Sequence, residues 1–294
     1  MSNAVKVTFE FFPPGDEDMA GHLWAAIQRL APLQPKFVSV TYGADGSTRS
    51  KTHECVLRIM RETDLVVAPH LTCVGASCEE VIGIAQDYWH HGVRHLVALR
   101  GDAPGVGAPG GSYRPYPGGF AYASDLVRGL KQTQPFEISV AAYPEGHPES
   151  GGVEADLDNL KRKVDAGASR AITQFFFDTD VFLRYRDRCA AAGIRAGVVP
   201  GILPITRFPQ LLRFAERCGA SVPDWLRQRF DGLDEDPETR RMIAAHVAIE
   251  QVQRLRRHGV EEFHFYTLNR AELTYAICHA LGLRPRVLEA ARVA

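Results

Sequence analysis

The fold prediction rests on residues 137–178, EISVAAYPEGHPESGGVEADLDNLKRKVDAGASRAITQFFFD. The stretch begins and ends with short apolar runs, Glu137–Tyr143 and Arg170–Phe176. Nearly continuous apolar runs of about seven residues are typical of strands that are covered on both faces. Between the runs, apolar residues recur with helical spacing in Val153–Ala166, and a glycine follows, as at many helix ends. The stretch therefore predicts a strand, a helix and a second strand parallel to the first.

The same alternation extends along the whole chain. The predicted strands are Val5–Phe11, Lys36–Tyr42, Val66–Thr72, Val93–Leu99, Glu137–Tyr143, Arg170–Phe176, Ala196–Ile202 and Glu261–Tyr266. The predicted helices are Met19–Leu33, Lys51–Thr63, Cys78–His91, Ala121–Gln134, Val153–Ala166, Thr179–Ala192, Phe208–Cys218, Glu238–His258 and Ala271–Leu281. Eight strands, each followed by helix, predict an α/β fold, a (β/α)8 TIM barrel. A doubly wound sheet uses the same alternation but usually has fewer strands. Because no linker divides the chain, we expect residues 1–294 to form one domain.

The composition excludes several classes of protein. The 294 residues include 34 Lys and Arg against 35 Asp and Glu. The resulting net charge of −1 offers no field that would steer the protein toward nucleic acid or an anionic membrane. No apolar run reaches the roughly 18 residues of a membrane span, and the N-terminus has no signal-peptide pattern. We therefore expect a cytoplasmic protein without nucleic-acid or membrane partners.

The cysteines and histidines predict neither disulfides nor a metal site. The six cysteines contain no CxxC pair, so we expect reduced, mostly buried thiols. The eleven histidines show neither HExxH nor another local spacing that aims two imidazoles at one metal ion.

One stretch, Gly101–Gly119, is less regular than the rest of the chain. It contains a formal GxGxxG at residues 105–110, with Asp125 twenty residues after Gly105. Pro109 lies inside this motif, however, and two more prolines follow where a helix should begin. The pattern therefore favours a loop beside a site over a dinucleotide-binding fingerprint.

Candidate functional residues lie at the predicted carboxyl ends of the strands, where such a barrel carries its chemistry. Glu10 lies among Phe9, Phe11 and Phe12. Burial among aromatic rings predicts a pKa raised toward neutrality, which suits a general acid. The alternative is a carboxylate that only binds a neighbouring strand or an arginine.

Two more strand ends carry candidates. Asp102 follows Gly101 after the fourth predicted strand and is either a functional carboxylate or a turn residue. Gln174 alternates with apolar neighbours, which favours an amide in the barrel lumen. There it would either bind the edge of a heterocycle or be a satisfied core side chain.

The predicted helix Val153–Ala166 has a polar stripe beside its apolar face. Asp156, Asn159 and Lys163 form the stripe, and Arg162 lies further round. Such a stripe either holds the hydroxyls and phosphates of a nucleotide or is a solvated flank.

A series of short blocks, in order along nearly the whole chain, is similar to one known family. These blocks are Phe9–Pro14, Thr41–Ala44, Leu99–Asp102, Ala121–Leu126, Ala142–Glu145, His147–Glu149, Leu160–Asp178, Pro200–Pro204 and Phe265–Arg270. Together they resemble methylenetetrahydrofolate reductase of the bacterial type, which consists of the catalytic barrel alone.

The resemblance implies a reductase that converts 5,10-methylenetetrahydrofolate to 5-methyltetrahydrofolate, a step of one-carbon metabolism and methionine biosynthesis. It implies FAD as a noncovalent cofactor and NADH or NADPH as co-substrate, with the choice between them open. In the implied ping-pong scheme, the nicotinamide reduces the flavin and leaves before the folate binds. The implied partners are these small molecules, together with further copies of the chain in a homo-oligomer.

The resemblance also implies roles for individual residues. Glu10 is implied as the acid that opens the methylene bridge, Asp102 as a carboxylate near flavin and pterin, and Gln174 as an amide shared by both substrates. The implied substrate contacts are Gln174, Gln210, Phe214 and Arg270. The implied FAD contacts are Thr41, Tyr42, Ala44, His70, Arg100, Gly101, Asp102, Tyr122, Ala123, Tyr143, His147, Asp156, Asn159, Arg162 and Lys163.

Two rival functions stay open from the residues alone. A lyase or aldolase acting on a phosphorylated substrate would need a strand-end lysine or a metal cluster, and the sequence shows neither. A barrel that only binds folate or flavin is the other rival. The presence of Glu10, Asp102 and Gln174 favours catalysis over binding alone.

Overall fold

The computed structural model describes residues 4–42, 49–102 and 113–286. Its strands are β1 (Lys6–Phe11), β2 (Val38–Val40), β3 (Val67–Thr72), β4 (His95–Leu99), β5 (Glu137–Ala142), β6 (Arg170–Thr173), β7 (Gly197–Val199), β8 (Gly201–Ile202) and β9 (Glu262–Tyr266). Its helices are α1 (Glu17–Leu30), a 3-10 turn η1 (Ala31–Leu33), α2 (Arg49–Glu62), α3 (Cys78–His90), α4 (Ala123–Thr133), α5 (Val153–Asp165), α6 (Thr179–Ala191), α7 (Phe208–Cys218), α8 (Asp224–Phe230), α9 (Pro237–Arg257) and α10 (Glu272–Ala280).

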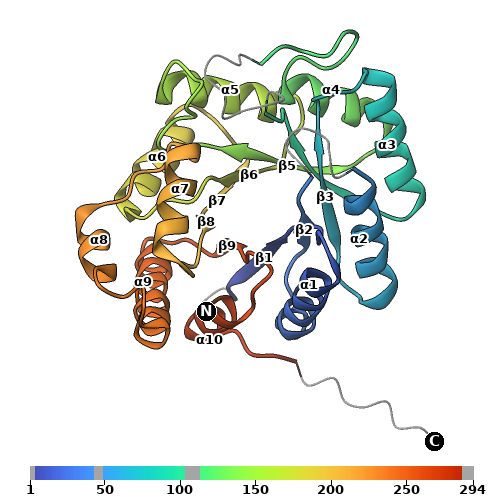
Figure 1. The fold of residues 1–294 in the computed structure, drawn as a ribbon. Coiled ribbons are helices and arrows are strands. Elements are labelled where there is room, and N and C mark those ends of the chain that lie inside the picture. Colours follow the sequence, from blue (N-terminus) through green and yellow to red (C-terminus); the bar gives the residue numbers. More distant parts are fainter. Residues whose placement is uncertain (1–3, 43–48, 103–112, 287–294) are drawn as a thin grey trace, which may run out of the picture.

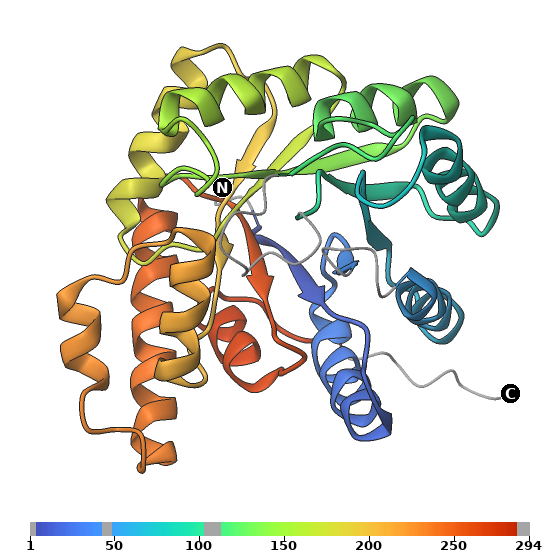
Figure 2. The same cartoon turned by 45° about the horizontal axis from the view of Figure 1, so that its top comes forward.

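The strands form one parallel sheet with the order β7-β6-β5-β4-β3-β2-β1-β9-β8. The two outer members, β7 and β8, are halves of the single predicted strand Ala196–Ile202, separated by Pro200. The first half pairs with β6 and the second with β9, so this one segment joins the two ends of the sheet. The strands therefore surround a central axis with the helices outside, as Figures 1 and 2 show. The predicted TIM-type barrel is confirmed.

Pro200 explains why the seventh strand divides. A proline has no N–H to donate to a ladder, so the pairing with β6 ends before it. Its carbonyl instead accepts a hydrogen bond from the His264 N–H of β9 at 3.0 Å. The strand thus changes partner at this residue.

Helix α8 is the element that the sequence analysis missed. It has seven residues, too few to show a clear helical period. Leu226 and Phe230 bury its inner face in an apolar cluster with α7 and α9. Tertiary packing rather than local pattern therefore holds this helix.

A charged layer closes the barrel at the amino ends of the strands. The Arg170 guanidinium binds Glu262 at 2.9 Å and Glu137 at 2.7 Å, and it lies over the Phe37 ring. Lys36 adds a 3.0 Å ion pair to Glu262. A ligand of the barrel therefore has to enter from the opposite, carboxyl end.

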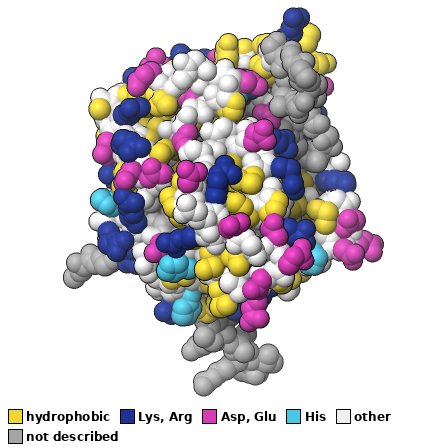
Figure 3. Space-filling model, turned by 60° about the vertical axis from the view of Figure 1, so that its left-hand side comes forward, with side chains coloured by type: hydrophobic (Ala, Val, Ile, Leu, Met, Phe, Trp, Pro, Cys, Tyr) yellow, Lys and Arg dark blue, Asp and Glu magenta, His cyan; other side chains and the backbone are white. Residues whose placement is uncertain are grey.

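The outer surface carries charges of both signs. On the face drawn in Figure 3, acidic and basic side chains are interspersed rather than segregated. This distribution agrees with the net charge of −1. Within the described part of the chain, none of the helices combines the length and the apolar character needed to cross a membrane.

Candidate functional site

A cavity of about 300 Å³ opens at the carboxyl ends of the strands. Its walls are mostly apolar side chains from β1, β4, β6 and α7, including Phe214. Four polar or titratable candidates also line it: Glu10, His70, Tyr143 and Gln174. An apolar hollow with a few converging polar groups is the usual form of a small-molecule site.

A larger cavity, of about 410 Å³, lies outside the barrel between α6, α8 and α9. Residues such as Trp225, Arg229 and Arg254 line it, and none of the predicted site residues does. Volume alone therefore does not identify the site, and we place it in the smaller cavity at the strand ends.

Alternation along two paired strands brings four polar side chains together. Thr8 pairs in register with His264, and Glu10 with Tyr266. Because side chains two residues apart in a strand share a face, all four lie on one side of the sheet. The His264 Nδ1 is 2.8 Å from the Thr8 hydroxyl, and its Nε2 is 3.4 Å from Glu10 Oε2. The four side chains thus form one polar group on the inner wall of the barrel.

Two imidazoles flank the Glu10 carboxyl. Its Oε2 lies 3.3 Å from His70 Nε2 as well as 3.4 Å from His264 Nε2, and its side chain is 18% exposed. Burial is the largest single effect and raises the pKa of Glu10, but the two imidazoles together outweigh it and lower that pKa to about 2. The predicted pKa near neutrality is therefore wrong. The local sequence shows only the phenylalanines, whereas the histidines come from β3 and β9.

Lowering the pH should lower the free energy of unfolding, because the Glu10 carboxylate becomes protonated. A lowered folded-state pKa means that ionised Glu10 stabilises the protein above pH 4.5, and that the stabilisation is lost as the pH falls toward about 2. The free energy of unfolding of the parent should exceed that of Glu10→Gln at pH 6, and the gap should narrow by about 1 kcal/mol at pH 3.5. Urea unfolding of both proteins at the two pH values measures this gap. A gap that is constant or widens toward pH 3.5 would contradict the assignment.

Gln174 lies one residue beyond the end of β6 and lines the cavity. Its Oε1 accepts a hydrogen bond from the Phe175 N–H at 3.0 Å. That bond orients the amide and leaves its NH2 group as the donor it offers to a ligand. The prediction of a lumen amide agrees with this position.

The ends of β4 and β5 bring together several further candidates. Gly101 has a φ of 86°, a left-handed conformation that glycine adopts easily, and Asp102 follows it. Burial, and then the charge of Asp102, raise the pKa of the Tyr143 phenol. The His147 ring packs edge-on against Tyr143, with 4.8 Å between ring centroids. Arg100 reaches Glu149 at 2.7 Å. These groups therefore form one edge of the site.

Two members of the polar stripe on α5 face inward. Asp156 and Lys163 are 5% and 4% exposed, so the solvated-flank alternative is wrong for both. Asp156 accepts hydrogen bonds from the His147 N–H and the Ser150 hydroxyl. The Lys163 Nζ donates to the Ala141 carbonyl at 2.6 Å, and burial lowers its pKa to about 8. The pair ties α5 to the end of β5 and to the loop after it.

The third member of the stripe, and Arg162 further round the helix, differ from this pair. Asn159 is half-buried and Arg162 is exposed. Only part of the predicted nucleotide-binding stripe therefore lies against the strand ends.

The remaining FAD candidates lie at β2 and α4. Thr41 accepts a hydrogen bond from Thr52 through its carbonyl, and the Tyr42 hydroxyl accepts one from Arg49 at 2.6 Å. Tyr122 is 59% exposed at the start of α4, next to Ala123. Ala44 and the GxGxxG segment lie outside the described residues.

Only some of the predicted substrate contacts lie at the strand-end cavity. Phe214 on α7 lines the cavity, and Gln210 lies one turn before it on the same helix, half-buried. Arg270 is exposed beyond β9 and is not part of the cavity wall. Side-chain movement or a bound ligand would be needed to bring it there.

His264 is the site residue that the sequence analysis missed. It lies between Phe263 and Phe265, as Glu10 lies between Phe9 and Phe11. The same signal, one polar side chain inside an aromatic strand, would therefore have found it.

Comparison with known proteins identifies the family. The family model described as methylenetetrahydrofolate reductase matches residues 1–282. The chain is 55% identical to 5,10-methylenetetrahydrofolate reductase of Pectobacterium carotovorum subsp. carotovorum, over 98% of this chain and 93% of the relative. It is also 55% identical to the protein of that name in Escherichia coli (strain K12), over 96% and 92%.

A solved structure supports the fold alone. It is an uncharacterized protein from Clostridium thermocellum that binds two copies of 5-methyl-5,6,7,8-tetrahydrofolic acid. Its TM-score is 0.62 at 12% identity, with 95% of each chain covered. The fold assignment thus has an experimental counterpart. From the family match and the close relatives, the chain belongs to the methylenetetrahydrofolate reductase family.

Proposed function

We propose that this protein reduces 5,10-methylenetetrahydrofolate to 5-methyltetrahydrofolate, with FAD as cofactor and NADH or NADPH as reductant, in the cytoplasm. One observation carries the proposal: Glu10 lies between two imidazoles on the wall of the strand-end cavity. The names of the relatives support the same reaction. The proposal includes a single catalytic domain and a homo-oligomeric assembly.

The residues at the strand ends fit FAD. A flavin ring presents flat apolar faces and hydrogen-bonding edges, and the apolar cavity supplies the walls. The buried Thr72 Oγ1 atom, two residues after His70 in β3, has no hydrogen-bond partner among the described residues. Buried polar atoms normally have partners, so a bound heterocycle would satisfy it. With Arg100, Asp102 and Tyr143 nearby, these residues would hold the cofactor.

When bound, FAD would supply the chemistry that carries a hydride from the nicotinamide to the folate, with the two substrates bound one after the other in the proposed ping-pong order. The chain itself has to manage one proton. Glu10 is ionised near neutral pH, because the two imidazoles beside it lower its pKa to about 2. We propose that Glu10 and His264 together deliver this proton to the folate. In this relay the Glu10 carboxyl passes a proton to the folate, and His264 replaces the proton on Glu10.

The other residues of the site are proposed to orient the substrates and to stabilise charge that develops on the folate. Opening of the methylene bridge develops positive charge on the folate, and the proposed role of Asp102 is to stabilise that charge. The Gln174 amide and the Phe214 ring line the cavity and are proposed to orient whichever substrate is bound. Both substrates would thus use one cavity at different times.

Flavin binding gives the first test. The purified protein should be yellow, or become yellow on incubation with FAD and keep the colour through desalting. The visible absorption spectrum and the released flavin measure the stoichiometry. A protein that stays colourless after this treatment would contradict the FAD proposal, whereas a yellow protein without folate turnover would favour the rival binding function.

A further inference from the structure

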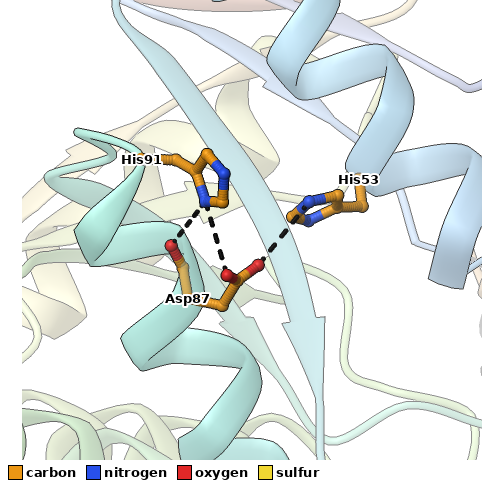
Figure 4. Close-up of side chains that lie close together, drawn as sticks. All are labelled: His53, Asp87 and His91. Atoms are coloured by element: carbon orange, nitrogen blue, oxygen red, sulfur yellow. Dashed lines mark hydrogen bonds and ion pairs between the residues drawn. The ribbon is translucent and has the colours of Figure 1, made fainter.

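Three side chains outside the catalytic cavity converge between two helices. His53 projects from α2, and Asp87 projects from α3, four residues before His91 at the end of the same helix. Figure 4 shows both imidazoles directed at the Asp87 carboxylate. None of the three has a part in the proposed reaction. We propose that they form a binding site for one transition-metal dication, of which Zn²⁺ is the type case.

The distances suit such an ion. The His53 Nε2 is 3.6 Å from one carboxylate oxygen of Asp87, and the His91 Nδ1 is 3.4 Å from the other. One ligand atom of each residue lies within 4.8 Å of those of the other two. Tetrahedral zinc with bonds near 2.1 Å separates its ligand atoms by about 3.4 Å. Small side-chain rotations therefore suffice to place all three around one ion.

The ligand types select the class of ion. Two imidazoles and one carboxylate bind Zn²⁺, Ni²⁺, Co²⁺ or Cu²⁺ in preference to Mg²⁺ or Ca²⁺, which prefer oxygen ligands. The three side chains are 30%, 52% and 43% exposed, so an ion can enter from solvent. Three protein ligands leave the fourth position to water, and the site is open rather than closed.

Two features partly preorganise the site. Asp87 and His91 lie one helical turn apart, so both side chains project on the same side of α3. The His53 ring packs against the buried Tyr88 ring, with 5.3 Å between centroids, which restricts its rotation. The His91 Nδ1 also lies 2.9 Å from the backbone carbonyl oxygen of Asp87. A metal ion bound to this nitrogen would take the place of the hydrogen bond to that carbonyl. A bound ion would tie α2 to α3.

Sequence spacing does not reveal this site, because His53 comes from a different helix. The Asp87–His91 pair alone is a common surface ion pair, and only packing of α2 against α3 adds the second imidazole. The inference is independent of the proposed reaction, since the cluster contains none of its residues.

Zinc titration of the tag-free holoprotein tests the proposal. Isothermal calorimetry with ZnCl2 should show one ion bound per chain, and Zn²⁺ should raise the melting temperature. His53→Ala and Asp87→Asn should each weaken the affinity at least about tenfold and remove the thermal shift. Asp87→Asn keeps the shape of an exposed side chain, so it separates ligand loss from misfolding.

His90→Ala is the matched control. It removes an exposed imidazole from the same helix, one residue from His91, without touching the cluster. Its zinc affinity should equal that of the parent, and all variants should keep the parent's circular dichroism and flavin content. Absence of zinc binding in the parent, or equal loss in His90→Ala and His53→Ala, would overturn the proposal.

Discussion

Replacement of Glu10 by glutamine should strongly slow folate reduction while FAD still binds and is still reduced by NADH or NADPH. Glutamine keeps the size of the side chain and accepts hydrogen bonds from the imidazoles 3.3 and 3.4 Å away, so the cavity keeps its shape. It cannot transfer a proton to the folate. We expect the folate half-reaction to slow by about 10²- to 10⁴-fold, the usual contribution of a positioned acid or base. Anaerobic stopped-flow measurement of each half-reaction separates the two steps.

Glu154→Gln is the control for this variant. It makes the same chemical change at a side chain on α5 that is 81% exposed and has no role in the proposed reaction. Both half-reactions of that control should match the parent. If Glu10→Gln reduced methylenetetrahydrofolate at the parent's rate, proton delivery through Glu10 would be excluded.

Replacement of Gly201 by alanine should strongly lower the free energy of unfolding. A Cβ at this position would lie 2.1 Å from the Thr173 carbonyl oxygen and 2.6 Å from the Tyr266 ring. The carbonyl belongs to the backbone of β6 and cannot rotate away, and Tyr266 is held by its 2.7 Å hydrogen bond to the same oxygen. We expect a loss of at least about 3 kcal/mol in the free energy of unfolding. Urea denaturation measures it.

Gly197→Ala is the matched control, only four residues earlier. A Cβ at Gly197 meets no atom within 4 Å, and its backbone does not have the left-handed conformation that favours glycine. This variant should remain within about 0.5 kcal/mol of the parent. Equal destabilisation of the two variants would show that the loss of a glycine, rather than the close approach at Gly201, is responsible.

The local pattern of the sequence predicted most of the fold. Apolar runs of about seven residues separated by amphipathic stretches require parallel strands with helices between them, and the structure has that order. The pattern failed where tertiary contacts decide. Helix α8 is too short to show a period, and the seventh strand divides because Pro200 has no N–H for the ladder.

Single residues of the candidate site show the same difference between what the local sequence predicts and what tertiary contacts decide. Position at a strand end was enough to select Glu10 and Gln174, which line the cavity, whereas Phe214 on α7, which also lines it, was selected by resemblance. The exposed Arg270 was selected by resemblance and is not in the cavity wall. A residue's place along a strand is a local property, whereas the reach of a long side chain depends on its surroundings.

The sequence by itself determined the barrel, the family and the end of the barrel that carries the site, because period, order of motifs and strand polarity are properties of the chain. Only the tertiary structure decided the charge of Glu10. Neighbouring phenylalanines predict a neutral carboxyl, but His70 and His264, from distant strands, lower its pKa to about 2. The convergence of His53 with Asp87 and His91 was likewise decided by packing between helices. Electrostatic environments depend on distance in space, which spacing along the chain does not determine.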